Sequence, residues 1–278
     1  MIFSRVALVL ILFLFCPSCL AGPARTVTPG PDSPTAAEDL AGPLPLILRE
    51  RMPVLLSTFT TNYIHATPSQ EANIALTAKR MCGIVVAPKQ VFSFNKALGP
   101  YTAERGYGMG RTFYGGRIGF SVGGGVCQVA STLYNTVLLA NLRVVERTAH
   151  SMTVPYLPPG RDATIYYGVY DFKFENDSNE PVMIWAGTKD RHLTISLYGR
   201  QSPPRVEIRT EILVSSPPPV EVTGEPAWPA GREEVVTPGQ SAVRSHTWLL
   251  VNGVVSRDLG VDEYLALTRR VKRGTGRT

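Results

Sequence analysis

Hydrophobic residues recur at helical spacing in the middle of the chain, between positions 126 and 140. The residues that share this apolar stripe are Val129, Leu133, Val137 and Ala140. Such spacing is typical of one buried face of an α-helix. Three glycines at 123–125 come just before it, and glycine allows a positive φ and a close approach of another chain. The pattern predicts a helix that begins at a glycine turn, with Cys127 in its first turn.

Short apolar runs and alternating patterns predict strands on both sides of this helix. Before it they cover 55–63, 84–86 and 91–95; after it they cover 142–147, 165–167, 171–175, 182–186 and 193–198. A further helix is predicted over 69–81, with Ser69 as its N-cap. Because helices come early and strands late, we expect an α+β fold, in which N-terminal helical segments and the central helix pack on an antiparallel sheet.

A proline-rich break at 215–219 separates a small C-terminal module from this main domain. The strands 245–251 and 254–257 are joined by Asn252-Gly253, a strong signal for a two-residue hairpin turn. The basic segment 269–277 is expected to be a frayed, solvated tail. The predicted organisation is a main domain over 51–200, a linker over 201–219 and a β-rich module over 220–278.

The N-terminus has the pattern of an export signal. Arg5 is followed by an apolar run over 6–15 and by small residues that end near Ala21, so residues 1–21 are predicted to be a secretory signal peptide. An uncut membrane anchor and a lipidated Cys19 are the alternatives. Residues 22–50 are rich in proline and alanine and are predicted to be a disordered linker. We therefore expect an extracytoplasmic protein, secreted or attached to the cell envelope, that meets the membrane only through its N-terminal segment.

Charge and motif content exclude several classes of partner. The chain has 28 Lys and Arg against 22 Asp and Glu, a formal net charge of +6, and no basic run interleaved with aromatic residues. Nucleic acid is therefore not an expected partner, although an anionic envelope polymer would attract the chain weakly. The glycine-rich stretch lacks the lysine and hydroxyl residue of a phosphate loop. Without a paired ligand motif, we expect no metal and no cofactor.

Cys127 is the candidate nucleophile. In the first turn of a helix, the unpaired N–H groups and the positive end of the macrodipole favour a thiolate over a thiol. The glycines at 123–125 support this interpretation, because a substrate backbone that approaches a thiolate needs room. The alternatives are an inert packed thiol and a disulfide with Cys82, the other cysteine left once the signal is removed.

A thiol nucleophile needs a base and a group that orients the base, as in papain-like hydrolases. His150 is the best-placed histidine, because it follows a strand that itself follows the cysteine helix. Its alternative role is that of a partly buried histidine bonded to a backbone carbonyl. Asp162 is the preferred orienting group, and an ion pair with the neighbouring Arg161 is its alternative role. Asp171 and Asn176 are further candidates for that group, and the less favourable bases are His65, His192 and His246.

Substrate-binding residues are expected around the cysteine. Backbone N–H groups of 125–128 are candidates to bind the oxyanion, with the Gln128 side chain as another donor. The glycine-dense segment 106–125 also carries aromatic and basic residues, and we expect it to form the walls of a cleft. The residues predicted to bind substrate are Gly123, Gly124, Gly125, Gln128, Arg161, Tyr107 and Arg111.

Many short motifs occur along the chain in the order found in one known family. They are Val91-Phe92-Ser93-Phe94-Asn95, Leu98-Gly99-Pro100, Gly106-Tyr107, Gly123 to Gln128, Ser131 to Asn135, Glu146-Arg147, His150-Ser151, Gly160 to Thr164 and Asp171 to Phe174. In these motifs residues 54–199 strongly resemble the VanW family, and the C-terminal module is similar to the G5 module that often accompanies it. The resemblance implies a bacterial envelope protein linked to glycopeptide-antibiotic resistance.

Some VanW-domain proteins are described as L,D-transpeptidases, which cross-link peptidoglycan through a cysteine. Carried over by motif, the resemblance implies Cys127 as that cysteine and His150 as its base, with Arg161 and Asp162 in support. Cys82 departs from the family pattern. We therefore expect an exported cysteine acyl-transferase or peptidase acting on peptidoglycan stem peptides. The alternative is a non-catalytic peptidoglycan-binding protein, with a groove at 105–125 and a structural Cys82–Cys127 disulfide.

Overall fold

The structure, a computed structural model, describes residues 42–114 and 117–276. The predicted signal peptide and most of the predicted disordered linker lie outside the described residues. The end of that linker forms the short helix α1 (Leu44–Glu50), so the expectation of disorder is wrong there. Leu46 of α1 is buried in a small apolar cluster with Met52 and Trp185, which gives these residues a reason to be ordered.

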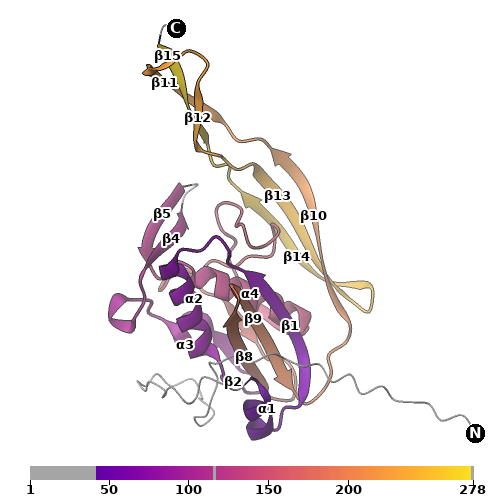
Figure 1. Ribbon diagram of the computed structural model, residues 1–278. Coiled ribbons are helices and arrows are strands. Elements are labelled where there is room, and N and C mark those ends of the chain that lie inside the picture. The colour runs from indigo at the N-terminus through magenta and orange to yellow at the C-terminus, as the bar shows by residue number, and fades with distance from the viewer. Residues whose placement is uncertain (1–41, 115–116, 277–278) are drawn as a thin grey trace, which may run out of the picture.

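A four-stranded sheet forms the centre of the main domain. Its strands lie in the order β1 (Val54–Asn62), β9 (His192–Gly199), β8 (Val182–Lys189) and β2 (Val85–Val86), with antiparallel neighbours throughout. The helices α2 (Pro68–Met81) and α4 (Val126–Leu139) pack against this sheet and against each other (Figure 1). The predicted α+β class, with a β-rich C-terminal region, is confirmed.

Helix α2 begins one residue before the predicted start, and its N-cap is Thr67 rather than Ser69. The Thr67 side chain accepts a hydrogen bond from the Gln70 backbone, and the Gln70 side chain accepts one from the Thr67 backbone. This reciprocal capping box pairs two backbone donors that the first turn would otherwise leave unpaired. Pro68 follows at the first helical position, where a missing N–H costs nothing.

A second small sheet lies beside the first. Its order is β3 (Val91–Ser93), β7 (Lys173–Glu175) and β6 (Arg143–Glu146). The predicted strand 91–95 is two residues too long, because the Ser93 side chain caps the short helix α3 (Phe94–Leu98). Phe94 and Leu98 of that helix are fully buried, so packing overrides the local alternation of polar and apolar residues. A 3₁₀ turn, η2 (Ala103–Arg105), follows.

Two segments have a different type of secondary structure from the one predicted. The glycine-dense stretch expected as loops forms an antiparallel hairpin of β4 (Met109–Tyr114) and β5 (Arg117–Val122). Conversely, no strand forms at 165–167. The chain there makes an exposed turn closed by a bridge between Tyr166 and Tyr170, and Gly168 at φ +79° reverses its direction.

The C-terminal module contains two three-stranded sheets. The first has β10 (Val206–Ser216), β13 (Ala242–Val251) and β14 (Val254–Tyr264), and the second has β11 (Val220–Pro229), β15 (Arg269–Gly276) and β12 (Glu233–Thr237). Strand β10 occupies most of the predicted linker. The hairpin turn at Asn252-Gly253 forms as predicted, with positive φ at both residues.

Strand β15 corrects the prediction of a frayed basic tail. It pairs in parallel with β11 and antiparallel with β12, and Val271 is buried between them. Arg270 forms an ion pair with Glu221 of β11, and Arg273 forms one with Glu233 of β12. The basic residues that suggested a solvated tail therefore stabilise a strand through cross-strand ion pairs.

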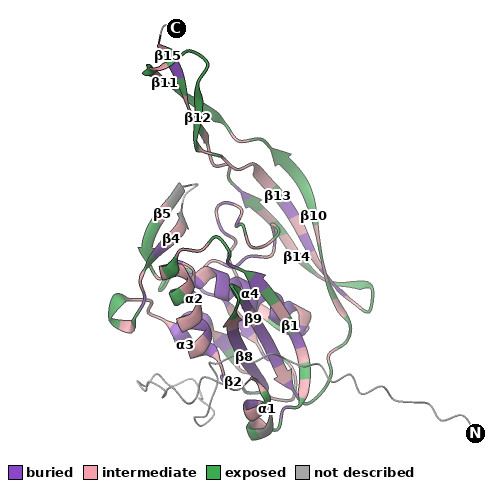
Figure 2. Cartoon of the chain, viewed as in Figure 1, coloured by how far each residue is buried: buried purple, intermediate pink, exposed green. Residues whose placement is uncertain are grey.

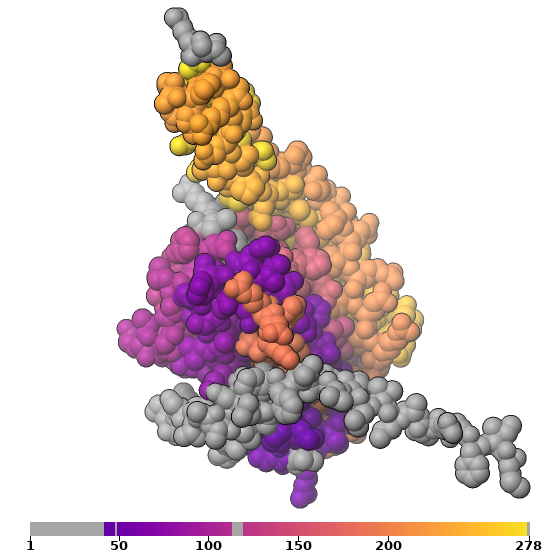
Figure 3. Space-filling model, in the orientation of Figure 1, coloured from indigo at the N-terminus to yellow at the C-terminus, as the bar shows by residue number. Residues whose placement is uncertain are grey.

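The first sheet of the module lies along one flank of the main domain (Figure 1). Leu249 of β13 belongs to the main core cluster, and Val206 and Ile208 of β10 pack against it. Buried residues concentrate in the two large helices and the central sheet, whereas the distal part of the module is mostly exposed (Figure 2). In the space-filling view the module covers one side of the domain and extends beyond it (Figure 3). No helix in the described part of the chain is both long and apolar enough to cross a membrane.

Candidate active site

The three glycines before α4 are explained by the protein's own backbone. Gly123 has φ +84°, and Gly125, the N-cap of α4, has φ +104°. A Cβ on Gly124 would lie 2.3 Å from the backbone carbon of Gly110 in β4. The buried Asn73 amide donates to the carbonyls of Gly108 and Gly124, both at 2.9 Å, and so holds the turn against the hairpin. These glycines therefore fix where α4 starts and where Cys127 lies.

Cys127 is a free thiol. The predicted alternative of a Cys82–Cys127 disulfide is wrong: Cys82 is itself disulfide-bonded, while Cys127 is not. The two cysteines also pack in different clusters, Cys82 with α1 and Cys127 with the main core. The Cys127 sulfur lies 3.4 Å from the backbone nitrogen of Ile165 and 3.5 Å from its carbonyl oxygen. It is thus held at the edge of the core.

His150 and Asp162 complete a chain of hydrogen bonds that begins at Cys127. The thiol and the imidazole are hydrogen-bonded to each other. Nδ1 of His150 donates to Oδ2 of Asp162 at 2.6 Å, and the His150 backbone N–H donates to the same oxygen at 2.7 Å. Since Nδ1 is engaged by Asp162, Nε2 is the nitrogen that faces the sulfur. The structure thus brings together the three residues predicted as nucleophile, base and orienting group.

The long segment between β6 and β7 carries both His150 and Asp162, and α4 holds that segment in place. Ser131 accepts a hydrogen bond from the Ala163 backbone at 2.9 Å and donates to the Cys127 carbonyl at 2.7 Å. Asn135, one turn further along, donates to the carbonyl of Arg161 at 2.7 Å. Polar side chains on one face of the helix therefore set the distance between Cys127 and the segment that supplies its partners.

Burial and the hydrogen-bond partners shift the pKa values of these three residues in opposite directions. Burial by itself would raise the pKa of the Cys127 thiol, but the hydrogen bond and positive charge of His150 outweigh burial and hold that pKa below the usual value. Burial by itself would lower the pKa of His150, but its bonds to Asp162 and Cys127 raise the pKa to about 9. For Asp162, burial is likewise outweighed by His150, and the pKa is lowered. The three directions together favour a thiolate beside an imidazolium at neutral pH.

Three further residues that the sequence did not single out surround Asp162. Tyr264 donates its hydroxyl hydrogen to Oδ1 at 2.6 Å, and Arg147 lies 3.3 Å from the same oxygen. Arg147 also binds both carboxylate oxygens of Asp262 at 2.6 Å. Only Arg147 had any sequence signal, as part of the Glu146-Arg147 motif. Asp262 and Tyr264 are 100 and 102 positions from Asp162 in sequence.

A family model described as "VanW like protein" matches residues 69–198, which contain Cys127, His150 and Asp162. This part of the chain, called the VanW-like domain, is therefore similar to that family. The protein YoaR of Bacillus subtilis (strain 168) is 41% identical over 143 residues, which are 51% of this chain and 47% of YoaR. The vancomycin B-type resistance protein VanW of Enterococcus faecalis (strain ATCC 700802 / V583) is 28% identical over 138 residues, 47% of this chain and 50% of that protein. The chain thus spans about half the length of these relatives.

Two solved structures are each similar to about a quarter of this chain. One is described as the IgA1 protease G5 domain, with 17% identity, a TM-score of 0.18, and coverage of 27% of this chain and 96% of that one. The other is HP0197-G5, with 18% identity, a TM-score of 0.16, and coverage of 26% and 100%.

Other predicted site residues of the VanW-like domain have structural roles that differ from the prediction. The amide of Gln128 donates to Oγ1 of Thr61 at 2.9 Å and to the carbonyl of Asn62 at 2.8 Å, so its two hydrogens are engaged with β1. This engagement contradicts the predicted oxyanion contact of that side chain. Tyr107 is buried and packs edge-on against Tyr101 at 5.5 Å, so it is a core residue and not a substrate contact.

The two predicted arginines are bonded to other parts of the main domain. Arg161 donates to Oδ1 of Asn135 at 2.6 Å and lies over the Phe59 ring. It does not pair with Asp162, so the alternative of an ion pair between these neighbours is not formed. Arg111 of β4 donates to the carbonyl of His65 at 2.5 Å.

The competing candidates are engaged elsewhere. Asp171 accepts from Ser93 and from the Asn95 backbone, and Asn176 closes the turn at 176–180. His192 is exposed at the start of β9, where its Nδ1 donates to the carbonyl of Asp190. His246 pairs with Asp258 in the module.

An exposed aromatic turn leaves the site directly after Ile165. Tyr166, Tyr167 and Tyr170 all project substantially into solvent. The Tyr167 ring stands edge-on to Tyr101, with centroids 6.4 Å apart, which fixes the base of the turn against the domain. These tyrosines, and not the buried Tyr107, are the accessible aromatic groups closest in sequence to the Ile165 contact with Cys127.

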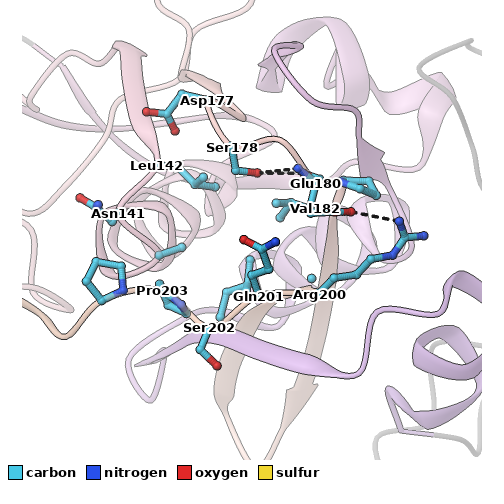
Figure 4. A pocket seen from close by; sticks show the side chains of 15 residues that line it. Asn141, Leu142, Asp177, Ser178, Glu180, Val182, Arg200, Gln201, Ser202 and Pro203 are labelled. Atoms are coloured by element: carbon cyan, nitrogen blue, oxygen red, sulfur yellow. Dashed lines mark hydrogen bonds and ion pairs between the residues drawn. The ribbon is translucent and has the colours of Figure 1, made fainter.

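A pocket of about 260 Å³ lies at the opposite end of α4 from Cys127 (Figure 4). It is lined by residues such as Asn141, Leu142 and Arg200. Arg200 is held at its rim by an ion pair with Glu180 at 3.0 Å. The lining includes none of the three residues of the hydrogen-bonded chain, so this pocket is separate from the candidate site. Among the described residues, no group of three or more His, Cys, Asp or Glu side chains is arranged to hold a metal ion.

Proposed function

We propose that this protein is a cell-envelope protein that performs cysteine-dependent acyl transfer on peptidoglycan stem peptides. The observation that supports this most is the hydrogen-bonded chain Cys127, His150 and Asp162 at the start of a helix in a VanW-like domain. The name of the relative from Enterococcus faecalis ties that protein to vancomycin resistance. We extend the association with glycopeptide resistance to this chain as part of the proposal.

In the proposed first step, the Cys127 thiolate attacks the carbonyl carbon of a stem-peptide amide. A carbon–sulfur bond forms, and the carbonyl π electrons move to the oxygen. The tetrahedral intermediate then collapses, the carbon–nitrogen bond breaks, and the amine leaves with the proton that His150 carried on Nε2. The products of this step are a thioester on Cys127, a free amine and a neutral His150. Asp162 holds the imidazole in the tautomer that this transfer needs.

In the second step an acceptor attacks the thioester. An amine of a neighbouring stem peptide gives a cross-link, and water gives a trimmed peptide. In either case His150 takes the proton of the attacking group, and the thiolate leaves with the carbon–sulfur electrons. The imidazolium and thiolate of the starting state are restored, so the cycle needs no oxidant, reductant or cofactor.

Backbone groups at the start of α4 are the proposed oxyanion donors. The N–H groups of Val126 and Gln128 are already bonded to the carbonyls of Gly123 and Gly125. Within the described part of the chain, no bond is recorded for the N–H groups of Gly125 and Cys127. Two such donors beside the reacting sulfur match the usual construction of an oxyanion site. Of the four backbone N–H groups at 125–128 predicted to bind the oxyanion, we therefore propose those of Gly125 and Cys127.

Muropeptide analysis tests the proposal. Purified sacculi or defined disaccharide-peptides are incubated with the native protein and with Cys127→Ala, and the products are separated and weighed. The native protein should generate cross-linked or trimmed muropeptides, and the variant should lose at least about 1,000-fold in rate because the nucleophile is removed. Equal product profiles for native protein and variant would reject catalysis through Cys127. Binding of sacculi without any product would instead favour the non-catalytic peptidoglycan-binding alternative.

A further inference from the structure

The C-terminal module contributes two side chains to the immediate surroundings of Asp162. Tyr264 and Asp262 lie near the end of β14, two positions apart, and therefore on the same face of the strand. That face is turned to the main domain, because the Tyr264 hydroxyl donates to Asp162 and the Asp262 carboxylate binds Arg147. Both residues lie outside the range matched by the VanW family model.

The two carboxylate oxygens of Asp162 have different hydrogen-bond partners. Oδ2 accepts the two hydrogen bonds from His150, at 2.6 and 2.7 Å. Oδ1 accepts from Tyr264 at 2.6 Å and is approached by Arg147 at 3.3 Å. A carboxylate fixed through both oxygens cannot rotate about its terminal torsion, so His150 always meets the same oxygen in the same direction.

The contact is buried and tightly built. Asp162 has no exposed surface, and Tyr264 is 2% exposed. The Tyr264 oxygen also accepts a hydrogen bond from the Gly160 backbone at 2.6 Å, which fixes the direction of its own hydrogen toward Asp162. Next to it, the Leu265 backbone donates to the Ser151 carbonyl at 2.7 Å, so the residues that flank His150 and Asp162 are joined to the module as well. Hydrogen bonds to a buried charged group are stronger than those between neutral groups.

Arg147 provides a second connection. Its guanidinium binds both oxygens of Asp262, and its Nε donates to the Asp162 backbone carbonyl at 2.6 Å. The Tyr134 ring lies under the guanidinium at 5.2 Å. Asp262 therefore balances the positive charge of Arg147 and keeps it in position beside Asp162.

We propose that the C-terminal module completes the active site: Tyr264 and Asp262 are positioning residues that hold Asp162, and through it His150, in the geometry that activates Cys127. The inference rests on the proposed function insofar as the site it completes is the proposed catalytic site. The bonds from Tyr264 to Asp162 and from Asp262 to Arg147 then control the reactivity of the thiol, and a VanW-like domain without these two side chains would have a weaker nucleophile.

The test measures the reactivity of Cys127 in the full-length protein and does not require turnover. The second-order rate of alkylation by iodoacetamide is measured from about pH 5 to about pH 10 for native protein, Tyr264→Phe and Asp262→Asn. Tyr264→Phe removes one hydroxyl and leaves the ring in place. The titratable and charged groups around the thiol that shape this profile are His150, Asp162, Arg147, Asp262, Tyr101, Tyr156 and Tyr264.

Arg257→Lys is the matched control. Arg257 of β14 donates to the carbonyls of Leu142 at 2.8 Å and Asn141 at 2.7 Å, at the end of α4 that is remote from Cys127. This variant weakens the same contact between module and domain without touching Asp162. A thermal melt of each variant checks that it remains folded at the temperature of the assay.

In Tyr264→Phe the thiol should react about 3- to 10-fold more slowly than in native protein near pH 6, as expected for a rise of up to about one unit in the pKa of the thiol. The rates should converge near pH 10, where the thiol is ionised in every variant. Arg257→Lys should follow the native profile. The inference would be overturned if Tyr264→Phe were alkylated near pH 6 as fast as native protein or faster. It would also be overturned if the alkylation rate of Arg257→Lys fell as far as that of Tyr264→Phe.

The inference and the proposed function fail in different ways. If muropeptides are not converted but Tyr264→Phe still slows alkylation, the module positions the thiol and the proposed function is wrong. If muropeptides are converted and the alkylation profiles coincide, the proposed function stands and the positioning role is wrong.

Discussion

At the scale of single residues, the chemistry depends on how partners reverse the effect of burial. A buried thiol is normally harder to ionise, and a buried imidazole is normally harder to protonate. Cys127 and His150 are shifted in the opposite directions because each stabilises the charged form of the other and Asp162 stabilises the imidazolium. The pair is therefore held as a thiolate and an imidazolium, which is the ionisation state that the proposed attack needs.

These shifts predict the pH dependence of muropeptide conversion. Activity should be limited on the acid side by protonation of Cys127, whose pKa lies below that of an ordinary thiol, and on the alkaline side by loss of the His150 proton, whose pKa is about 9. The rate should rise with pH as Cys127 ionises to the thiolate that attacks, and it should fall as His150 loses the proton that the leaving amine needs. The measurement is kcat/KM against pH, and a rate that rises steadily from pH 8 to pH 10 would indicate an unperturbed thiol instead.

The sequence was sufficient to predict that Cys127, His150 and Asp162 lie together, because their order along the chain restricts how a helix and the following segment can meet. It was insufficient for Tyr264, which contacts Asp162 across 102 positions. It also misled at Gln128 and Tyr107: both residue types are typical of active sites, but one is bonded to β1 and the other is buried in the core. Which side of an element a residue faces is decided by packing and not by residue type.

At the scale of elements, helix α4 is unusual in burying polar residues together with apolar ones. Thr132 accepts or donates a hydrogen bond with Thr61 of β1 at 2.8 Å, and Ser57 of β1 donates to the Thr136 carbonyl at 2.7 Å. On another side, Ser131 and Asn135 bind the segment that carries Asp162. The helix is thus bonded both to the sheet and to the segment that carries His150 and Asp162, which fixes the position of Cys127 relative to both.

The glycine turn before α4 gives a prediction at this scale. Gly124→Ala places a Cβ against the backbone of Gly110, which cannot move aside like a flexible side chain. The free energy of unfolding should fall by about 1–3 kcal/mol, the usual range for overpacking, as measured by chemical denaturation.

Gly119→Ala in β5 is the control for that prediction, because its Cβ would meet only Oγ1 of Thr112 at 3.7 Å. It should leave stability within about 0.5 kcal/mol of the native value. Equal stability of the two variants would show that the close approach at Gly124 is not a constraint on the fold.

Periodicity predicted α2, α4 and the strands β8 and β9 because their apolar faces pack on one core. It missed the hairpin β4–β5, whose glycines resemble loop composition, and β15, whose basic residues resemble a solvated tail. In β15 the arginines pair with glutamates on neighbouring strands, so the strand is stabilised by contacts that local pattern does not reveal. The turn at 165–170 has the aromatic composition of a strand, but Gly168 reverses the chain there.

At the scale of the whole molecule, the module and the main domain form one unit around the candidate site. Leu249 of the module lies in the main core, Arg257 contacts the residues that follow α4, and Tyr264 contacts Asp162, whose neighbours in sequence are bonded to the middle of α4. The first sheet of the module therefore contacts the main domain at several places, while its second sheet extends away (Figure 3). The proline-rich boundary in the sequence suggested that the main domain and the module are independent. In the structure, however, side chains of the module contact Asp162 and Arg147 of the main domain.

The most direct test of the central claim is to capture the acyl group on Cys127. Native protein is mixed with a defined stem-peptide donor without an acceptor, quenched in acid at short times, and digested for peptide mass mapping. We predict a thioester on the peptide that contains Cys127, with the mass of the donor less its leaving amine, and loss of that adduct when an acceptor amine is added before the quench. Products that form with no acyl group on Cys127, or with the acyl group on another residue, would contradict it.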